Sequence, residues 1–264
     1  MQGRLTDEDV RSIVRLLSMV CEVEGGRIAQ VRALMGGLSR LVSAGYWAWG
    51  RGVELYPGSL PKWILTACGG FDQSGMAKLL KAQEHPDMAT LTAPFARLLA
   101  EKGGQVTRLR QQTDPDDHFS KSGAYQFWAD AGIAPGILSC RPIDETSVSV
   151  AAIYRRMDEP RFTARESKIA HIVLTEVSWL HDHPDEARQR ERLAALSPRE
   201  RTVLNLLALG YPRKQVADNL GLSLHTINDY TKHLYRTFGV HSQQELMARF
   251  YTGDGGDGDF DPQI

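Results

Sequence analysis

The sequence predicts an α+β protein in which an antiparallel sheet with helices is followed by a small all-α module. At 264 residues the chain is long enough for about two domains of roughly 150 residues each. Hydrophobic residues make up 42% and charged residues 24%, the mixture of a globular protein with a substantial core. Strand-like and helix-like patterns alternate over the first two thirds of the chain, and only helical patterns follow. Together these observations indicate the fold class.

Charge divides the chain into three segments. Residues 1–195 carry equal numbers of basic and acidic side chains, whereas residues 196–250 carry seven basic and four acidic ones. Residues 251–264 carry four aspartates and no basic residue, and this Gly- and Asp-rich tail has too little apolar surface to fold alone. The formal net charge of -1 excludes a histone-like polycation, but it conceals a basic module between a neutral body and an acidic tail.

The body is expected to open with two helices and to continue with strands. The first helix begins after Thr6, a residue type favoured at helix N-caps. Short runs of aromatic and β-branched residues then predict strands, and two apolar helical patterns follow, the second of them after Pro86 and Asp87. The expected order is helices at 7–23 and 27–44, strands at 46–49, 52–55 and 63–67, and helices at 76–83 and 88–102.

The second half of the body is expected to end in a hairpin and a long helix. Thr163 and Glu166 have the spacing of a capping box, which predicts a helix from there to about His181. The expected order is a strand at 106–110, a polar loop at 114–122, a helix at 124–131, two strands at 136–142 and 147–155, and the last helix.

Residues 196–250 predict four short helices. Ser197 and Glu200 have capping-box spacing, with Pro198 at the first helical position. Gly221 makes the turn after the second helix, and Ser223 can cap the third. The expected helices begin at about 197, 213, 223 and 242. Helices of this size around a tight glycine turn are typical of a helix-turn-helix DNA-binding unit.

Three segments of this module also carry a family resemblance. LSPRERTVLNLLALG, KQVADNLGLSLHTI and LYRTFGVHSQQEL resemble the DNA-binding domain at the C-terminus of LuxR-type transcription factors. The resemblance covers roughly 55 residues without a gap and includes all four helices. It implies that the third helix enters the major groove and that the fourth mediates dimerisation.

The resemblance also implies which side chains face DNA. The family usually has a basic residue where Asn228 stands and a His where Tyr230 stands, and Asp229 adds an acid to this face. Asn can bind adenine through two hydrogen bonds, and Asp can accept one from a cytosine amine. The alternative is that Asp229 lies in solvent, or that the module has lost tight DNA binding. The expected DNA-binding residues are Lys214, Ser223, His225, Thr226, Asn228, Asp229, Tyr230, Lys232, His233 and Arg236.

The order of elements in the body is similar to that of GAF and PAS sensor domains. Helices, strands, helices and a hairpin precede a long last helix, and RFTARESKIAHIVLTEVSWL resembles the way GAF-type domains end. A receiver domain, with its sequential βαβ pattern and acidic pocket, is not visible. The autoinducer-binding domain that precedes this module in quorum-sensing relatives is an alternative, although its characteristic aromatic and aspartate positions are not matched.

Aromatic residues cluster in the body and suggest a ligand pocket. A pocket lined by some of them could hold a small molecule, and the alternative is that they simply fill the core. The candidate pocket residues are Tyr46, Trp47, Trp63, Tyr125 and Trp128.

Other chemistries lack the residues that they need. His181 and His183 are two positions apart, so their side chains diverge on a helix, and a helix end entering a linker is the better interpretation. The acidic loop at 114–118 lacks the glycine and glutamate of a calcium loop. Cys140 is expected to be a buried apolar residue, and three widely spaced cysteines suit a reducing compartment. No set of nucleophile, base and orienting residue is visible, so neither an enzyme, a metal nor a cofactor is expected.

Together these patterns predict a cytoplasmic, dimeric transcription regulator. Its partners would be double-stranded DNA, a second copy of the chain and a small-molecule effector, with no membrane association. The alternative is a regulator whose N-terminal domain is a protein-interaction or dimerisation module without a ligand. The four tail aspartates could also lie over the third helix and compete with DNA. The expected parts are a GAF-like sensor domain at 1–184, a helical linker at 185–195, the LuxR-type helix-turn-helix domain at 196–250 and the tail at 251–264.

Overall fold

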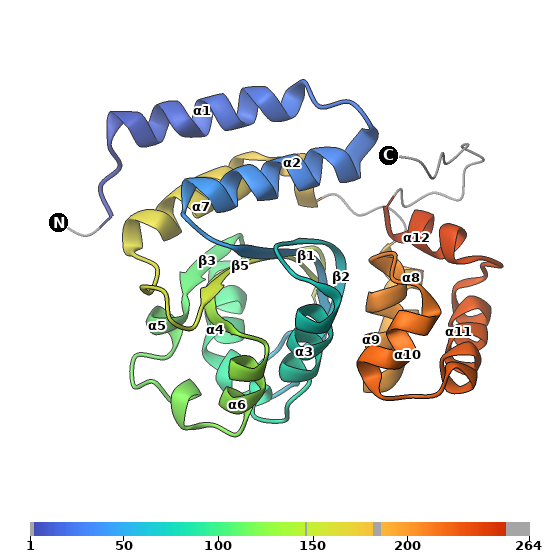
Figure 1. Cartoon of the computed structure of the whole chain (residues 1–264). Coiled ribbons are helices and arrows are strands. Elements are labelled where there is room, and N and C mark those ends of the chain that lie inside the picture. Colours follow the sequence, from blue (N-terminus) through green and yellow to red (C-terminus); the bar gives the residue numbers. More distant parts are fainter. Residues whose placement is uncertain (1–2, 146, 182–185, 252–264) are drawn as a thin grey trace.

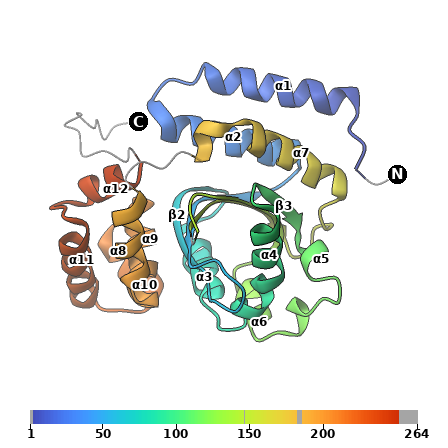
Figure 2. The same cartoon turned by 180° about the vertical axis from the view of Figure 1, so that it is seen from behind.

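Two layers of helices enclose an antiparallel sheet, and the C-terminal helices form a separate group beside it (Figure 1). The computed structural model describes residues 3–145, 147–181 and 186–251. Helices α1 (Asp7–Cys21), α2 (Gly26–Leu41) and α7 (Ala164–Glu176) lie on one side of the sheet, and α3 (Gln73–Gln83), α4 (Met88–Lys102) and α6 (Ala124–Asp130) lie on the other, as both views show (Figure 2). This arrangement confirms the expected mixed body with a helical C-terminal part.

Within the described residues the sheet has five strands in the order β2-β1-β5-β4-β3, and each pair of neighbours is antiparallel. This order leaves β2 and β3 at the two edges, and β4 and β5 form the predicted hairpin. The strands are β1 (Tyr46–Val53), β2 (Lys62–Gly69), β3 (Val106–Leu109), β4 (Ile133–Pro142) and β5 (Ser147–Arg156).

The two strands expected at 46–49 and 52–55 are a single strand, β1. The prediction was wrong because it left Gly50 and Arg51 out of both runs. In the structure a side chain larger than glycine would clash at positions 50 and 52. A Cβ at Gly50 would lie 2.1 Å from the Ile64 carbonyl oxygen, and one at Gly52 would lie 2.5 Å from the Trp63 ring. A bulge between Trp49 and Gly50 accommodates this close approach of β2.

The helix expected to run from 163 to His181 ends earlier, at Glu176. The predicted capping box is present, since the Thr163 side chain accepts from the Glu166 backbone N–H. Val177 leaves the helical region at φ -95° and ψ 77°, and the chain resumes as a short 3-10 helix, η2 (Ser178–His181). His181 is buried there, with Nδ1 2.9 Å from Ser149 Oγ and Nε2 2.7 Å from the Leu174 carbonyl oxygen. Tertiary hydrogen bonds therefore replace the last helical turn.

The polar loop expected at 114–122 is organised by one buried carboxylate. The loop follows a single helical turn, α5 (Arg110–Thr113), and contains a 3-10 turn, η1 (Phe119–Lys121). Asp114 is only 8% exposed, and it accepts hydrogen bonds from the backbone N–H groups of Phe119 and His118 and from the Arg110 guanidinium. Burial opposes its ionisation, but these hydrogen bonds and the Arg110 charge hold the pKa of Asp114 at about 2.

The C-terminal helices have nearly the predicted bounds. Ser197 and Glu200 form the predicted capping box, and Ser223 accepts from the Thr226 backbone N–H. The second and third helices end at glycines with positive φ, Gly221 at 63° and Gly239 at 65°. The helices are α8 (Glu186–Ala195), α9 (Pro198–Ala208), α10 (Arg213–Leu220), α11 (Leu224–Phe238) and α12 (Gln243–Tyr251). Helix α8 covers most of the predicted linker, and residues 252–264 of the predicted tail lie outside the described residues.

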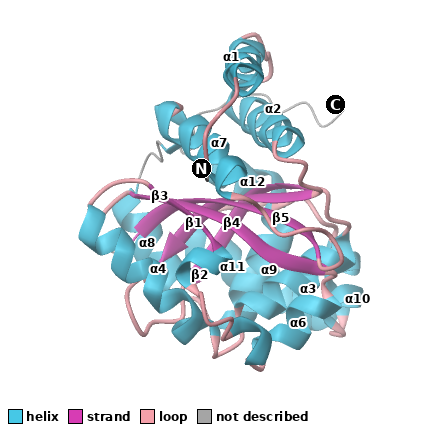
Figure 3. Ribbon diagram, turned by 90° about the vertical axis from the view of Figure 1, so that its left-hand side faces the viewer, coloured by secondary structure: helices cyan, strands magenta, loops and turns pink. Residues whose placement is uncertain are grey.

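The group formed by these helices packs on the body at one edge of the sheet. Helix α9 contacts β2 and α3, and α10 contacts α3. In the view of Figure 3, α9 and α10 lie below the sheet together with α3 and α6. One continuous apolar core joins the two parts, since it includes Leu65 of β2 and Leu204 of α9.

The role of Asp114 gives a first prediction. Replacement Asp114→Asn leaves the Phe119 and His118 N–H groups with a poorer acceptor, so the free energy of unfolding should fall by about 1–3 kcal/mol at neutral pH. Because the pKa of Asp114 is depressed to about 2 from an ordinary value of 3.8, its contribution is complete above about pH 4 and is lost as the pH falls towards 2. Denaturant unfolding of both proteins between pH 7 and about 2 should therefore show the difference shrinking with acid. The exposed neighbour Asp116→Asn is the control, and an equal loss there would contradict the account.

Candidate functional site

The outer face of α11 presents a row of polar side chains. His225, Asp229, Lys232 and Arg236 recur at the spacing of a helix face, and all four are exposed. The opposite face of α11 is fixed by the buried Ile227, Thr231, Leu234 and Phe238. Because packing holds one face of the helix rigidly, the other is available for a partner, and we call the four exposed residues the α11 ridge.

The acid on the α11 ridge lies between two basic side chains. Asp229 Oδ2 is 3.4 Å from His225 Nε2, and Asp229 Oδ1 is 3.8 Å from Lys232 Nζ. The Asp229 side chain is 57% exposed, so its ion pair with Lys232 is worth about 1 kcal/mol or less. Because this contribution is small, the Asp229 carboxylate can exchange its contacts with His225 and Lys232 for another hydrogen-bond donor.

Asn228 is held by a residue that sequence reasoning did not include. Its Oδ1 accepts from Arg213 Nη1 at 3.3 Å, while Arg213 Nη2 donates to the Tyr235 hydroxyl at 3.3 Å. The Arg213 guanidinium also lies over the Tyr235 ring, 5.7 Å from its centroid. Tyr235 lies two turns after Asn228, so both side chains lie on one face of α11, and Arg213 stands at the start of α10. This spacing is the sequence signal that could have suggested a shared partner for Asn228 and Tyr235.

The remaining predicted DNA-binding residues surround the α11 ridge. Ser223 caps α11, and its Oγ is 2.8 Å from Thr226 Oγ1, so both hydroxyls are engaged at the helix start. Lys214 is exposed on α10, and Tyr230 is half-buried against the core. His233 pairs with Glu200 of α9, with 3.2 Å between Nε2 and Oε1.

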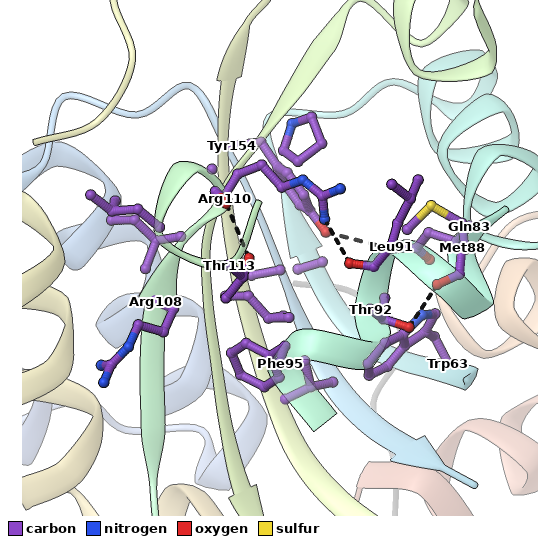
Figure 4. Close-up of a pocket in the computed structure, with 18 of the residues that line it drawn as sticks. Trp63, Gln83, Met88, Leu91, Thr92, Phe95, Arg108, Arg110, Thr113 and Tyr154 are labelled. Atoms are coloured by element: carbon purple, nitrogen blue, oxygen red, sulfur yellow. Dashed lines mark hydrogen bonds between the residues drawn. The ribbon is translucent and has the colours of Figure 1, made fainter. Parts of the chain in front are cut away.

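A second feature is a cavity of about 80 Å³ between the sheet and the α3, α4 and α6 layer (Figure 4). Its wall is largely apolar and includes Leu65, Leu91 and Phe95. Three fully buried polar atoms at this wall have no hydrogen-bond partner within the described part of the chain: Gln83 Oε1, Trp128 Nε1 and Arg110 Nε. Leaving a buried polar atom without a partner is costly, so a hydrogen bond to any of these atoms would be stabilising.

Two further polar groups border the cavity. Tyr154 lies 3.5 Å from Gln83 Nε2, and burial raises the pKa of the Tyr154 hydroxyl, so it is protonated at neutral pH. Arg110 donates from Nη1 to the Leu91 carbonyl oxygen at 3.1 Å (Figure 4). The predicted pocket did not include Gln83, Tyr154 or Arg110. Gln83 could have been suggested by the sequence, because it is a polar residue at the end of an apolar helical pattern.

The predicted pocket aromatics are divided between different places. Trp63 and Trp128 line the cavity, while Tyr125 borders a neighbouring polar cavity of about 340 Å³. Tyr46 packs against Phe71 with 5.0 Å between ring centroids and does not line the cavity. Trp47 is buried on the opposite face of the sheet in the core that includes Leu34 and Leu38 of α2. Adjacent residues of a strand point to opposite faces, so Tyr46 and Trp47 cannot share one pocket.

Other candidate chemistry has a structural explanation where the chain is described. Among those residues, no group of three or more His, Cys, Asp or Glu could hold a metal ion. Asp182 and His183 lie outside the described residues. Cys140 is fully buried in β4, and this burial raises the pKa of its thiol. None of the described helices combines the length and apolar character that crossing a membrane requires.

Comparisons with known proteins find a family match for the C-terminal part. Residues 194–250 match the family model "Bacterial regulatory proteins, luxR family". A 63-residue stretch is 33% identical to the "Probable HTH-type transcriptional regulator GfsR" of Streptomyces halstedii, and it represents 24% of this chain and 26% of that protein. The chain thus spans about a quarter of the length of this curated relative.

Two solved structures are also similar to the chain. One is "SdiA in complex with octanoyl-rac-glycerol", with 14% identity and a TM-score of 0.40 over 93% of this chain and 95% of that one. The other is Escherichia coli SdiA, with 14% identity and a TM-score of 0.41 over 92% of this chain and 98% of that one.

The matched residues are the ones that form the end of α8 and helices α9 to α12, including the α11 ridge. The match confirms the expected LuxR-type helix-turn-helix module in this part of the chain. Residues 194–250 thus match the luxR family model of bacterial regulatory proteins, and they form a LuxR-type helix-turn-helix domain at the C-terminal end of the described chain.

Proposed function

We propose that the chain is a cytoplasmic, dimeric transcription regulator that reads the major groove with α11 and responds to an effector bound in the cavity of the body. The observation that carries this proposal is the exposed α11 ridge on a helix whose other face is buried, within a helix-turn-helix domain. A helix held in this way can enter the major groove without reorganising the domain.

The charge of the α11 ridge argues for binding as a dimer. Lys232 and Arg236 are its only permanent cations, and Asp229 offsets one of them. Phosphate contacts dominate the affinity for DNA, so one copy of this ridge binds weakly. Two copies on half-sites about one helical turn apart combine their contacts, and Asn228 and Asp229 then supply base-edge hydrogen bonds to adenine and cytosine.

The unpaired atoms of the cavity indicate the chemistry of the effector. An acceptor on the ligand would take a hydrogen bond from Trp128 Nε1, and a donor would bond to Gln83 Oε1. The apolar wall suits a hydrocarbon portion. We therefore infer a small, mostly apolar effector with an amide-like head that both donates and accepts.

One observation favours the alternative of a protein-interaction body. Val10 is 50% exposed and Val14 is 59% exposed, and they lie one turn apart on α1. An apolar pair of this kind on the outermost helix is available to another protein surface. The two functions separate in binding measurements, because only the effector function requires a small molecule to stabilise the native body.

Replacement Lys232→Ala should weaken binding to every DNA sequence. The change removes a cation from the α11 ridge, so the slope of log affinity against log salt should fall by about 0.9 for each copy on DNA. Fluorescence anisotropy with a specific and a random duplex over a salt series measures both effects. Lys168→Ala, which removes an exposed cation from α7, is the matched control. A loss confined to the specific duplex would contradict a phosphate-contact role.

Replacement Asp229→Ala should relax the choice of base at one position of each half-site. The lost hydrogen bond to a base edge corresponds to about 1–3 kcal/mol of discrimination. Selection of binding sites from random DNA with the variant and the unmodified protein compares the two motifs. An unchanged motif would contradict base contact by Asp229.

The straight-chain primary amides from butanamide to octanamide should include ligands of the cavity. They carry both hydrogen-bonding functions on an apolar chain, so binding should raise the thermal unfolding midpoint. The corresponding carboxylates lack the N–H donor for Gln83 Oε1, so they should raise the midpoint less than the amides do. Trp128→Phe should weaken amide binding about three- to tenfold, whereas Trp47→Phe, on the other face of the sheet, should not. Equal amide binding by the two variants would contradict the proposed site.

A further inference from the structure

The outer edge of β2 is closed by a side chain of the DNA-binding domain. Asn205 of α9 donates from Nδ2 to the Trp63 carbonyl oxygen at 3.0 Å, and its Oδ1 accepts from the Leu65 backbone N–H at 2.7 Å. Asn205 is 2% exposed, although its neighbours Leu204 and Leu206 are apolar. An unpaired amide in such a place is costly, so these two hydrogen bonds account for a polar residue at this position.

The arrangement reproduces the hydrogen bonding of an added strand. Trp63 and Leu65 are two residues apart, so their backbone groups point to the same edge of β2. One residue of a parallel neighbour would place its N–H on the first carbonyl and its C=O on the second N–H. The carboxamide of Asn205 carries the same donor and acceptor, and it therefore satisfies an edge that would otherwise be open.

Further contacts between the two parts surround this pair of hydrogen bonds. Lys62 Nζ donates to the Ala194 carbonyl oxygen at 2.6 Å, and Arg201 lies 3.9 Å from Glu84 of the body. At the exposed rim, Gln73 of α3 donates to Gln215 of α10. Asn205 is distinct among these residues because its partners are backbone atoms of a sheet strand.

The same stretch of β2 forms part of the cavity wall. The side chains of Trp63 and Leu65 line the cavity, while their backbone groups bond to Asn205. A molecule that contacts these side chains restrains the strand that carries both hydrogen bonds. The cavity and the interface between the two parts are thus separated by a single strand.

We propose that Asn205 is a positioning residue that docks the DNA-binding domain on β2, and that docking and occupancy of the cavity stabilise each other. The second half of this proposal rests on the cavity being the effector site. The α11 ridge stays exposed in the docked arrangement, so docking fixes the direction of the ridge and does not block it. Coupling between two sites is reciprocal, so a weaker interface must also weaken binding in the cavity by the same factor.

The docking role is tested by hydrogen exchange at the Leu65 backbone amide in the full chain. Asn205→Leu fills the same buried position with an apolar side chain and removes both hydrogen bonds. Exchange at the Leu65 amide should therefore become about three- to tenfold faster. Gln73→Ala, which removes a hydrogen bond at the rim of the same interface, should leave Leu65 unchanged. Unchanged amide protection within α10 and α11 shows that the variant domain is still folded. Equal protection of Leu65 in Asn205→Leu and the unmodified protein would overturn the docking role.

The coupling is tested without any ligand by filling the cavity. Ala152 of β5 lines the cavity, and Ala152→Val adds apolar volume to it. Exchange at Leu65 should become slower in this variant, and an unchanged or faster rate would overturn the coupling.

The affinity for hexanamide separates this proposal from the effector function. Weaker binding to Asn205→Leu than to the unmodified protein supports the coupling, because Asn205 does not line the cavity. Equal binding to both proteins overturns it. Failure of hexanamide to bind the unmodified protein counts against the proposed effector chemistry alone, since the two exchange experiments decide docking and coupling without it.

Discussion

A strand that is buried at the edge of a sheet must find partners for its outward-facing backbone groups, and much of this structure follows from how β2 meets that requirement. Asn205 supplies the missing donor and acceptor at Trp63 and Leu65. The apolar faces of β2 and α9 can then share one core, because no unpaired amide remains between them at this point. The DNA-binding domain is consequently part of the same packed unit as the sheet, although its α11 ridge faces solvent.

The two candidate functional features consist of groups that packing leaves exposed or without hydrogen-bond partners. The α11 ridge is exposed because its helix buries only one face, and the cavity wall keeps polar atoms without partners, Gln83 Oε1 and Trp128 Nε1 among them. Unpaired buried groups are uncommon in folded proteins, and these two belong to residues that line one cavity. The single strand β2 separates the cavity from the interface that Asn205 makes with the body.

Local sequence signals predicted the helices well, and long-range contacts explain the failures. The caps at Thr6, Thr163, Ser197 and Ser223 are set by neighbours within one turn, so the sequence is sufficient to place them. Residues 46–49 and 52–55 were predicted as two strands because the close approach of β2 at Gly50 could not be foreseen from the sequence. The early end of α7 depends on hydrogen bonds of His181 to Ser149 and Leu174.

The candidate sites divide in the same way. The four residues of the α11 ridge were among those that the resemblance to LuxR-type domains implied, whereas the hydrogen bond from Arg213 to Asn228 depends on the packing of α10 against α11. Sequence clustering placed five aromatic residues in one pocket, and strand alternation separated two of them. A single asparagine in an apolar helix gave no indication that its partners lie some 140 positions earlier in the chain.

The most direct test of the account is a selection of genomic DNA fragments with the purified full-length protein. If α11 reads the major groove as part of a dimer, the bound fragments share one two-fold symmetric site whose half-sites are about one helical turn apart. Enrichment of no common site at low salt would contradict DNA reading by this chain.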